Sequence, residues 1–98
     1  MDGVYNLKGK TAWITGGKRI GQRVAEVLAG HGANIVLSYN KSRKEAEETI
    51  KKIKKYKVKA LIVKTDVSSR QDVIEAVTEI KKHFNKLDIL VLMASVFE

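Results

Sequence analysis

Glycines and basic residues in the segment from Lys10 to Gly21, KTAWITGGKRIG, make it the part of the chain best suited to hold a ligand. Gly16 and Gly17 follow a short apolar run and precede a stretch with helical periodicity. Glycines at such a turn reach backbone angles closed to other residues and leave no Cβ between the main chain and a ligand. The helix that follows directs unpaired N–H groups and the positive end of its dipole at the same point. A strand, a glycine turn and a helix in this order favour the binding of a phosphate.

The glycine spacing by itself is a weak signal. Glycines at positions 16, 17 and 21 do not match G-x-G-x-x-G, and no G-K-S/T is present that would make a P-loop. A glycine-rich turn between a strand and a helix, without any ligand, is the alternative. The rest of the chain has to distinguish the two.

Composition excludes several other kinds of site. The 98 residues contain no cysteine, which excludes disulfides and cysteine-based metal sites, and His31 and His83 stand far apart without a ligand partner. We therefore predict no metal site. No apolar stretch approaches the roughly 20 residues of a membrane span, and the N-terminus lacks the apolar core of a signal peptide. These features favour a cytoplasmic protein with no membrane partner.

The formal net charge of +8 favours an anionic ligand or simply solvent as its partner. Many of the lysines lie in residues 51–59, where they fit the solvated face and tail of a helix. Aromatic residues do not alternate with them as they do in proteins that bind single-stranded nucleic acid. We therefore expect no nucleic-acid partner, and a basic nucleic-acid binder is the least supported alternative.

Hydrophobic patterning predicts strands and helices in alternation. The predicted strands are Thr11–Thr15, Asn34–Tyr39, 58–64 and 87–93. The predicted helices run from the glycine turn to Gly30, from the cap residue Ser42 to Tyr56, and from the cap residue Ser69 to Asn85. The residues predicted to face the core are Ile20, Val24, Val27 and Leu28, with Ala25 beside them, then Ala46, Ile50 and Ile53, then Val73, Val77, Ile80 and Phe84, with Ile74 adjoining. On the second helix, Glu47 with Lys51 and Glu48 with Lys52 stand at the i,i+4 spacing that favours an ion pair.

The element order βαβαβαβ, with connections long enough for right-handed crossovers, predicts an α/β fold. We expect one half of a doubly wound, Rossmann-type parallel sheet with strand order 3-2-1-4, forming a single domain over residues 1–98. Ligands of such sheets bind outside the carboxyl ends of the strands. The segments at these ends are the glycine turn and residues 38–42, 65–67 and 94–97. Their convergence makes a nucleotide site the favoured interpretation.

Over its whole length the sequence resembles the short-chain dehydrogenase/reductase family. The motifs LKGKTAWITGG followed by IG, then TDVS, then LDILV-x-x-AS, occur in the family's order and close to its spacing. K-R-I-G replaces the usual central glycine, and Ser38-Tyr-Asn-Lys-Ser42 follows the second strand. In these features the sequence looks most like the NADPH-dependent pteridine reductase and 3-oxoacyl-carrier-protein reductase branches.

The resemblance implies a cofactor site and a choice of cofactor. The residues that match the pyrophosphate loop are Thr15, Gly16, Gly17, Ile20 and Gly21. NAD-preferring members end the second strand with an acidic residue, but here Tyr39 stands there, between Ser38 and Asn40, so no carboxylate repels a 2′-phosphate. The basic and hydroxyl groups that can reach that phosphate belong to Arg19, Lys41 and Ser42, with Lys18 and Arg43 as further helpers. Charge-assisted hydrogen bonds from these groups favour NADP over NAD. The alternative is that Ser42 only caps the helix and that the lysines are solvated.

The later segments resemble the rest of the family's cofactor site. Asp66 matches the residue that meets the adenine edge, with Val67 donating from its backbone; the alternative is a simple turn aspartate. Ala94 and Ser95 match the segment beneath the nicotinamide ribose. Phe97 resembles an aromatic residue that stacks near nicotinamide and pterin in the pteridine reductases, although a core phenylalanine is equally compatible with its position.

The chain departs from the family pattern in ways that bear on catalysis. The glycine turn is one residue shorter than in pteridine reductases, and Leu92-Met93 replaces a pair of asparagines. Family catalysis uses a serine together with the tyrosine and lysine of Tyr-x-x-x-Lys, and no lysine lies four residues after Tyr5, Tyr39 or Tyr56. We therefore identify no catalytic residue and expect these 98 residues alone to be inactive in hydride transfer.

Two functional hypotheses follow. The first is the N-terminal NADP-binding part of a short-chain reductase, and the second is a stand-alone, non-enzymatic module that binds a nucleotide or a protein. The affinity for dinucleotide distinguishes them, and the shortened glycine turn favours weak binding. In the family the fourth strand lies inside the sheet beside a fifth strand, which residues 1–98 do not include. We therefore expect self-association through the apolar edge at residues 89–93 or through the third helix.

Overall fold

The computed structural model describes residues 6–15, 18–41 and 43–92 and confirms an α/β fold built on a parallel sheet. The elements in chain order are β1 (Thr11–Thr15), α1 (Lys18–Gly30), β2 (Asn34–Tyr39), α2 (Arg43–Ile53), the 3-10 turn η2 (Lys54–Tyr56), β3 (Ala60–Lys64), α3 (Arg70–Phe84) and β4 (Ile89–Leu92). All paired strands are parallel, and their order in the sheet is β3-β2-β1-β4, as predicted.

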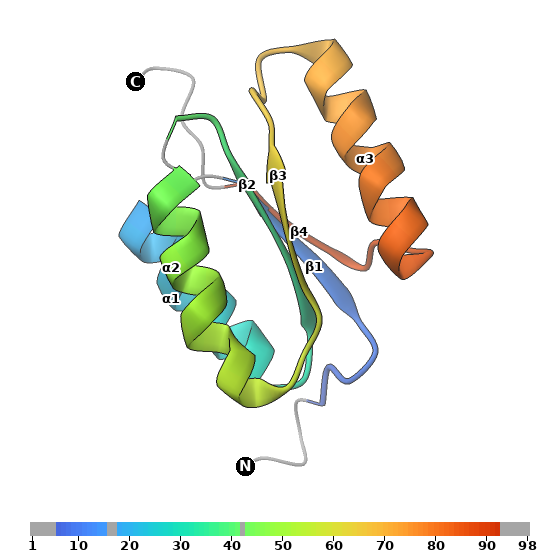
Figure 1. Ribbon diagram of the computed structural model, residues 1–98. Coiled ribbons are helices and arrows are strands. Elements are labelled where there is room, and N and C mark those ends of the chain that lie inside the picture. The colour runs from blue at the N-terminus through green and yellow to red at the C-terminus, as the bar shows by residue number, and fades with distance from the viewer. Residues whose placement is uncertain (1–5, 16–17, 42, 93–98) are drawn as a thin grey trace.

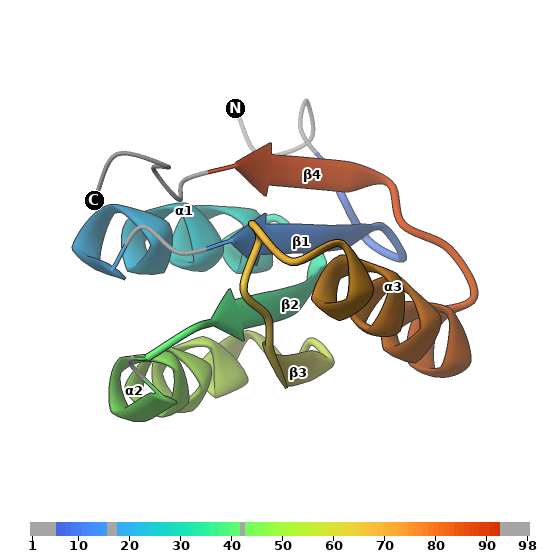
Figure 2. The same cartoon turned by 90° about the horizontal axis from the view of Figure 1, so that it is seen from above.

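The helices cover both faces of this sheet. Helices α1 and α2 lie on one face and α3 lies on the other (Figure 1). Seen from above, β4 forms one edge of the sheet and β3 the other (Figure 2). The chain steps outward from β1 through β2 to β3, then returns through α3 to the far side of β1. The strand order therefore reverses between β1 and β4, which makes the carboxyl ends of these strands a topological switch point.

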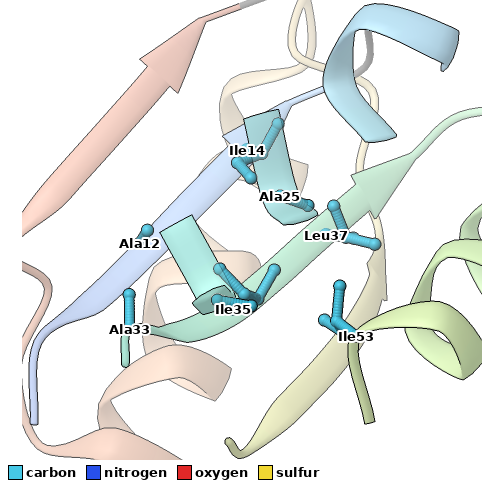
Figure 3. Packing of buried hydrophobic residues seen from close by; sticks show 8 residues of the cluster. Ala12, Ile14, Ala25, Ala33, Ile35, Leu37 and Ile53 are labelled. Carbon is cyan, nitrogen blue, oxygen red and sulfur yellow. The ribbon is translucent and has the colours of Figure 1, made fainter. Parts of the chain in front are cut away.

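Side chains of β1 and β2 alternate between two cores. Those facing α1 and α2 include Ile14, Ile35 and Leu37, which gather with Ala25 and Ile53 from the helices (Figure 3). On the opposite face, a second cluster is built around Trp13, Val36, Ala76 and Ile80. Every residue of β1 is buried, and so are the central residues of β2. This burial on both faces explains why the two strands read as nearly continuous apolar runs rather than as alternating ones.

Polar groups in the buried layer have specific partners. The Trp13 indole Nε1–H donates to Ser38 Oγ across the β1–β2 pair at 3.1 Å, so this N–H is not left unpaired in the core. At the other end of β1, the Thr11 N–H donates to Asp88 Oδ2 at 2.9 Å, and the Asp88 N–H donates to the Thr11 carbonyl at 2.9 Å. This reciprocal pair fixes the start of β4 beside the start of β1.

The structure corrects part of the predicted helix faces. Val27 of α1 was expected in the core but is 58% exposed, while Ala29 is buried. In α3, Ile74 is exposed and Ala76 is buried. With about 3.6 residues per turn, residues two apart point to nearly opposite sides of a helix. The small residues Ala29 and Ala76 define the sides that contact the sheet, so Val27 and Ile74, each two positions away, face solvent despite their size.

Most predicted boundaries are confirmed within a few residues. Ser69 caps α3, because its Oγ accepts from the Asp72 N–H at 3.2 Å, and the helix ends at Asn85, which has φ of 69°. The predicted cap at Ser42 lies outside the described residues. Strand β3 begins at Ala60 rather than at residue 58, and the Lys59 N–H donates to the Asn34 side chain at 2.9 Å rather than to a backbone carbonyl. The described part of β4 runs from residue 89, not 87.

Strand β4 pairs with β1 along one side only within the described part of the chain. Ile89 and Val91 pack on the core beside α1, whereas Leu90 and Leu92 are 51% and 71% exposed on the opposite face. An apolar strand at the sheet edge is the feature that the sequence predicted for this region. Among the helices that the structure describes, none combines the length and apolarity that crossing a membrane requires.

Candidate functional site

The carboxyl ends of the four strands lie side by side at one end of the sheet. Thr15 at the end of β1 lies opposite Ser38 of β2 and opposite Leu92 of β4. Tyr39 lies opposite Lys64 of β3, and its carbonyl accepts from the Thr65 N–H at 2.8 Å. The segments that follow β1, β2 and β3 therefore start side by side, as the predicted topology requires.

The end of β1 leads directly into α1. Thr15 is buried, and its Oγ1 donates to the Val91 carbonyl at 3.4 Å, which ties β1 to β4 at the switch point. Helix α1 begins at Lys18, so Lys18, Arg19 and Ile20 form its first turn, and Gly21 is buried in the next. This first turn carries no acidic residue. The positive end of the α1 dipole is therefore not neutralised by a carboxylate of its own helix.

A cation is held at the end of β2. The Tyr39 hydroxyl accepts a hydrogen bond from Arg43 Nη1 at 3.0 Å, and the guanidinium carbon lies 5.9 Å from the centroid of the Tyr39 ring. On its other side, Arg43 Nε donates to Glu47 Oε2 at 3.0 Å. The hydrogen bonds that Arg43 donates, first to Glu47 and then to Tyr39, hold the pKa of Arg43 above its ordinary value. Asn40 and Lys41, the next two residues after Tyr39, are exposed.

The end of β3 forms a turn closed by Asp66. Its Oδ1 accepts from the Ser68 hydroxyl at 2.6 Å and from the Ser68 N–H at 2.9 Å. These hydrogen bonds, with a smaller contribution from the positive charge of Lys41, lower the pKa of the Asp66 carboxyl. The Asp66 N–H donates to Asp72 Oδ2 at 3.0 Å, which joins this turn to the first turn of α3. The turn aspartate that the sequence left as an alternative is thus present, and the contact of Asp66 and Val67 with adenine stays a prediction.

The lowered pKa of Asp66 predicts an acid-sensitive contribution to stability. Its ionised carboxylate stabilises the fold at pH values above the ordinary aspartate pKa of 3.8, and this contribution is lost as the pH falls through the lower pKa of the folded state. We expect Asp66→Asn to lower the free energy of unfolding at neutral pH, and the difference from the unaltered chain to shrink towards about pH 3. Denaturant unfolding across this range measures it. Ser68→Ala, which removes the shorter hydrogen bond, should reproduce part of the loss, and a difference independent of pH would contradict the assignment.

Several predicted site residues are not tested by this geometry. Gly16, Gly17, Ser42, Ala94, Ser95 and Phe97 lie outside the described residues. The structure places Lys18, Arg19 and Ile20 in the first turn of α1, and their contacts with a cofactor stay predictions. In the described ranges, no group of three or more histidine, cysteine, aspartate or glutamate residues is arranged to hold a metal ion.

The structure brings Glu47, which the sequence pattern did not place at the site, beside Arg43, and it buries Thr65 in one of the predicted site segments. Glu47 contacts Arg43 rather than Lys51, so the predicted ion pair is wrong. Arg43 and Glu47 also stand at the i,i+4 spacing, which could have indicated the pair, but the spacing alone cannot choose between two partners. Thr65 is buried after β3, and its Oγ1 has no hydrogen-bond partner within the described part of the chain. Nothing in the sequence around Thr65 indicated such burial.

Comparison with known proteins agrees with this arrangement. The family model described as short chain dehydrogenase matches residues 10–98. The uncharacterized oxidoreductase YhdF of Bacillus subtilis is 43% identical over 90 residues, which are 91% of this chain and 31% of the relative. The chain therefore spans about a third of this relative's length.

Solved structures show the same fold. A dehydrogenase/reductase from Sinorhizobium meliloti superposes with a TM-score of 0.89 at 32% identity, covering 98% of this chain and 38% of the other. A short chain dehydrogenase from Burkholderia cenocepacia in complex with NADP has a TM-score of 0.86 at 35% identity, covering 95% of this chain and 38% of the other. The closer resemblance to the pteridine reductase or 3-oxoacyl-carrier-protein reductase branch stays a prediction.

Proposed function

This chain belongs to the short-chain dehydrogenase family, and we propose that residues 1–98 bind the dinucleotide of an oxidoreductase, with NADP preferred over NAD. The binding region in this proposal lies at the carboxyl ends of the strands, between the first turn of α1 and the ends of β2 and β3. This is the switch point where ligands of doubly wound sheets bind. The Burkholderia cenocepacia neighbour, solved in complex with NADP, supports the cofactor class.

The observation that carries the NADP preference is Arg43, the first residue of α2, which contacts Tyr39 at the end of β2. A carboxylate at the Tyr39 position would repel a 2′-phosphate, whereas the Tyr39 hydroxyl instead positions a guanidinium. The Arg43 side chain is 65% exposed, so its remaining N–H groups are accessible to a ligand. A guanidinium recognises the oxygens of a phosphate through paired N–H groups. Arg19, Lys41 and Ser42 complete the proposed 2′-phosphate site.

A calorimetric titration with NADPH and, separately, with NADH at low and moderate salt tests this function. We expect NADPH to bind with a dissociation constant on the order of micromolar and NADH to bind more weakly. Binding of neither cofactor would favour the alternative of a non-enzymatic interaction module. In the same samples, NADPH absorbance in the presence of carbonyl substrates should stay constant, because residues 1–98 supply no Tyr-x-x-x-Lys motif.

We also propose that the chain associates with itself through β4. Leu90 and Leu92 expose apolar surface next to an edge that has no strand partner among the described residues. Sedimentation should show a species whose mass increases with concentration, and Leu92→Lys should reduce that increase. The matched variant Ile74→Lys tests the alternative surface on α3. A monodisperse monomer at high concentration would contradict both routes.

A further inference from the structure

We propose that Glu47 competes with a bound 2′-phosphate for Arg43 and so limits the preference of this chain for NADPH over NADH. The inference rests on the proposed function, since it assigns a role to Glu47 in the same cofactor site. Glu47 lies on α2, one helical turn after Arg43, and its spacing in the sequence predicted only an ion pair with Lys51.

The geometry shows how much of the Arg43 guanidinium is already engaged. Nε donates to Glu47 Oε2 at 3.0 Å, and Nη1 donates to the Tyr39 hydroxyl at 3.0 Å. Bidentate binding of a phosphate uses two parallel N–H groups from one edge of the guanidinium. Glu47 occupies the edge of the guanidinium that contains Nε, and the Tyr39 hydroxyl occupies one N–H of Nη1. A phosphate must therefore use the remaining N–H groups beside the Glu47 carboxylate or displace that carboxylate.

Tyr39 and Glu47 act on the phosphate in opposite directions. The Tyr39 hydroxyl accepts from Arg43, so its own proton is available to donate to a phosphate oxygen. Glu47 can only accept when ionised, and it brings a negative charge to the cation that the phosphate needs. Two anions bound to one guanidinium lie within several ångströms of each other, where they repel even in a solvent-like dielectric.

Glu47 also favours phosphate binding, because it orders the Arg43 side chain, but this favourable effect is small. Both side chains are exposed, 65% for Arg43 and 49% for Glu47, and exposed i,i+4 pairs stabilise a helix only weakly. Tyr39 orients the guanidinium independently through its hydroxyl and its ring. Asp66, a further carboxylate at the strand ends, is engaged by Ser68. Repulsion from Glu47 therefore outweighs its contribution to order, and removing its charge should strengthen phosphate binding.

The test is a calorimetric titration of the whole chain and its Glu47→Gln variant with NADPH and with NADH. Glutamine keeps the size of the side chain and an oxygen that accepts from Arg43. We expect the affinity for NADPH to rise about three- to tenfold and the affinity for NADH to stay within about twofold. The gain should shrink as salt is added, because the interaction is exposed to solvent.

Two controls separate competition for Arg43 from a general change in charge. Glu48→Gln removes the same charge from the adjacent position of the same helix, where the structure shows no contact with Arg43, and should change NADPH affinity by less than about twofold. In an Arg43→Gln background, Glu47→Gln should produce no selective gain.

The outcomes distinguish failure of the inference from failure of the function. No NADPH binding by the unaltered chain would overturn the proposed function and the role of Glu47 together. NADPH binding that Glu47→Gln leaves unchanged or weakens would overturn the role of Glu47 alone. An equal gain from Glu48→Gln would do the same, since it would reduce the effect to net charge.

Discussion

Replacing Ile35 with alanine lowers the free energy of unfolding by about 3 kcal/mol, the range typical of buried isoleucine truncations. Ile35 is 0% exposed in the middle of the sheet and lies among Ile14, Leu37 and Ile53, between β2 and the helices (Figure 3). The truncation removes methyl and methylene groups from a site enclosed on every side. The strand backbone fixes the surrounding positions, so the cavity cannot collapse fully.

Thermal and urea unfolding measure this loss, and the midpoint of thermal unfolding should fall by more than about 10 °C. Val27→Ala is the matched control, because it also shortens a β-branched apolar residue but at a position that is 58% exposed. We expect it to change the free energy of unfolding by less than about 0.5 kcal/mol. A loss for Val27→Ala comparable to that for Ile35→Ala would contradict the packing of α1 against the sheet.

Replacing Arg43 with glutamine is expected to lower the affinity for NADPH by about tenfold, as loss of a charge-assisted contact with phosphate would. The affinity for NADH should change little, because NADH carries no 2′-phosphate. Glutamine removes the cation as well as the N–H groups that Tyr39 and Glu47 hold in place. Titration with the two cofactors measures the selective loss.

The choice between lysine and glutamine at position 43 separates charge from geometry. Arg43→Lys keeps the positive charge but cannot bind Tyr39, Glu47 and a phosphate through one planar group. Its NADPH affinity should therefore lie between those of the unaltered chain and of Arg43→Gln. Lys59→Gln removes a positive charge just before β3, at the amino end of the sheet, and should leave both affinities nearly unchanged. An equal loss for NADPH and NADH in Arg43→Gln would place Arg43 outside the 2′-phosphate site.

Much of the fold was predictable because its signals are local. The bounds of β1 and β2 match their nearly continuous apolar runs, since both strands are buried on both faces and carry no charged residue. Ser69 and Asn85 mark the two ends of α3 by chemistry that depends on neighbouring residues only. The element order predicted the doubly wound sheet, and the apolar runs placed Tyr39 at the end of one strand and Asp66 just after another.

The contacts of the candidate site were less predictable. Arg43 could be recognised as a cation near the end of β2, but its partners could not, because Glu47 has three basic residues at i,i+3 or i,i+4 spacing: Arg43, Lys44 and Lys51. The choice depends on where the Tyr39 hydroxyl lies after β2 is placed in the sheet. The Asp66 carboxylate could bind a ligand or stabilise a turn. The structure shows the turn, because the Ser68 hydroxyl donates to Asp66 Oδ1.

By itself, the sequence determined the alternation of strands and helices, the apolar character of the central strands and the polar residues that follow them. These properties depend on periodicity and on interactions between residues close in the chain. Only the tertiary structure decided that Ala29 and Ala76, rather than Val27 and Ile74, face the sheet, and that Arg43 lies between Tyr39 and Glu47. The physical reason is that the rotation of a helix against a sheet, and the partner of a long charged side chain, minimise the energy of the whole assembly of elements. No single segment contains that information.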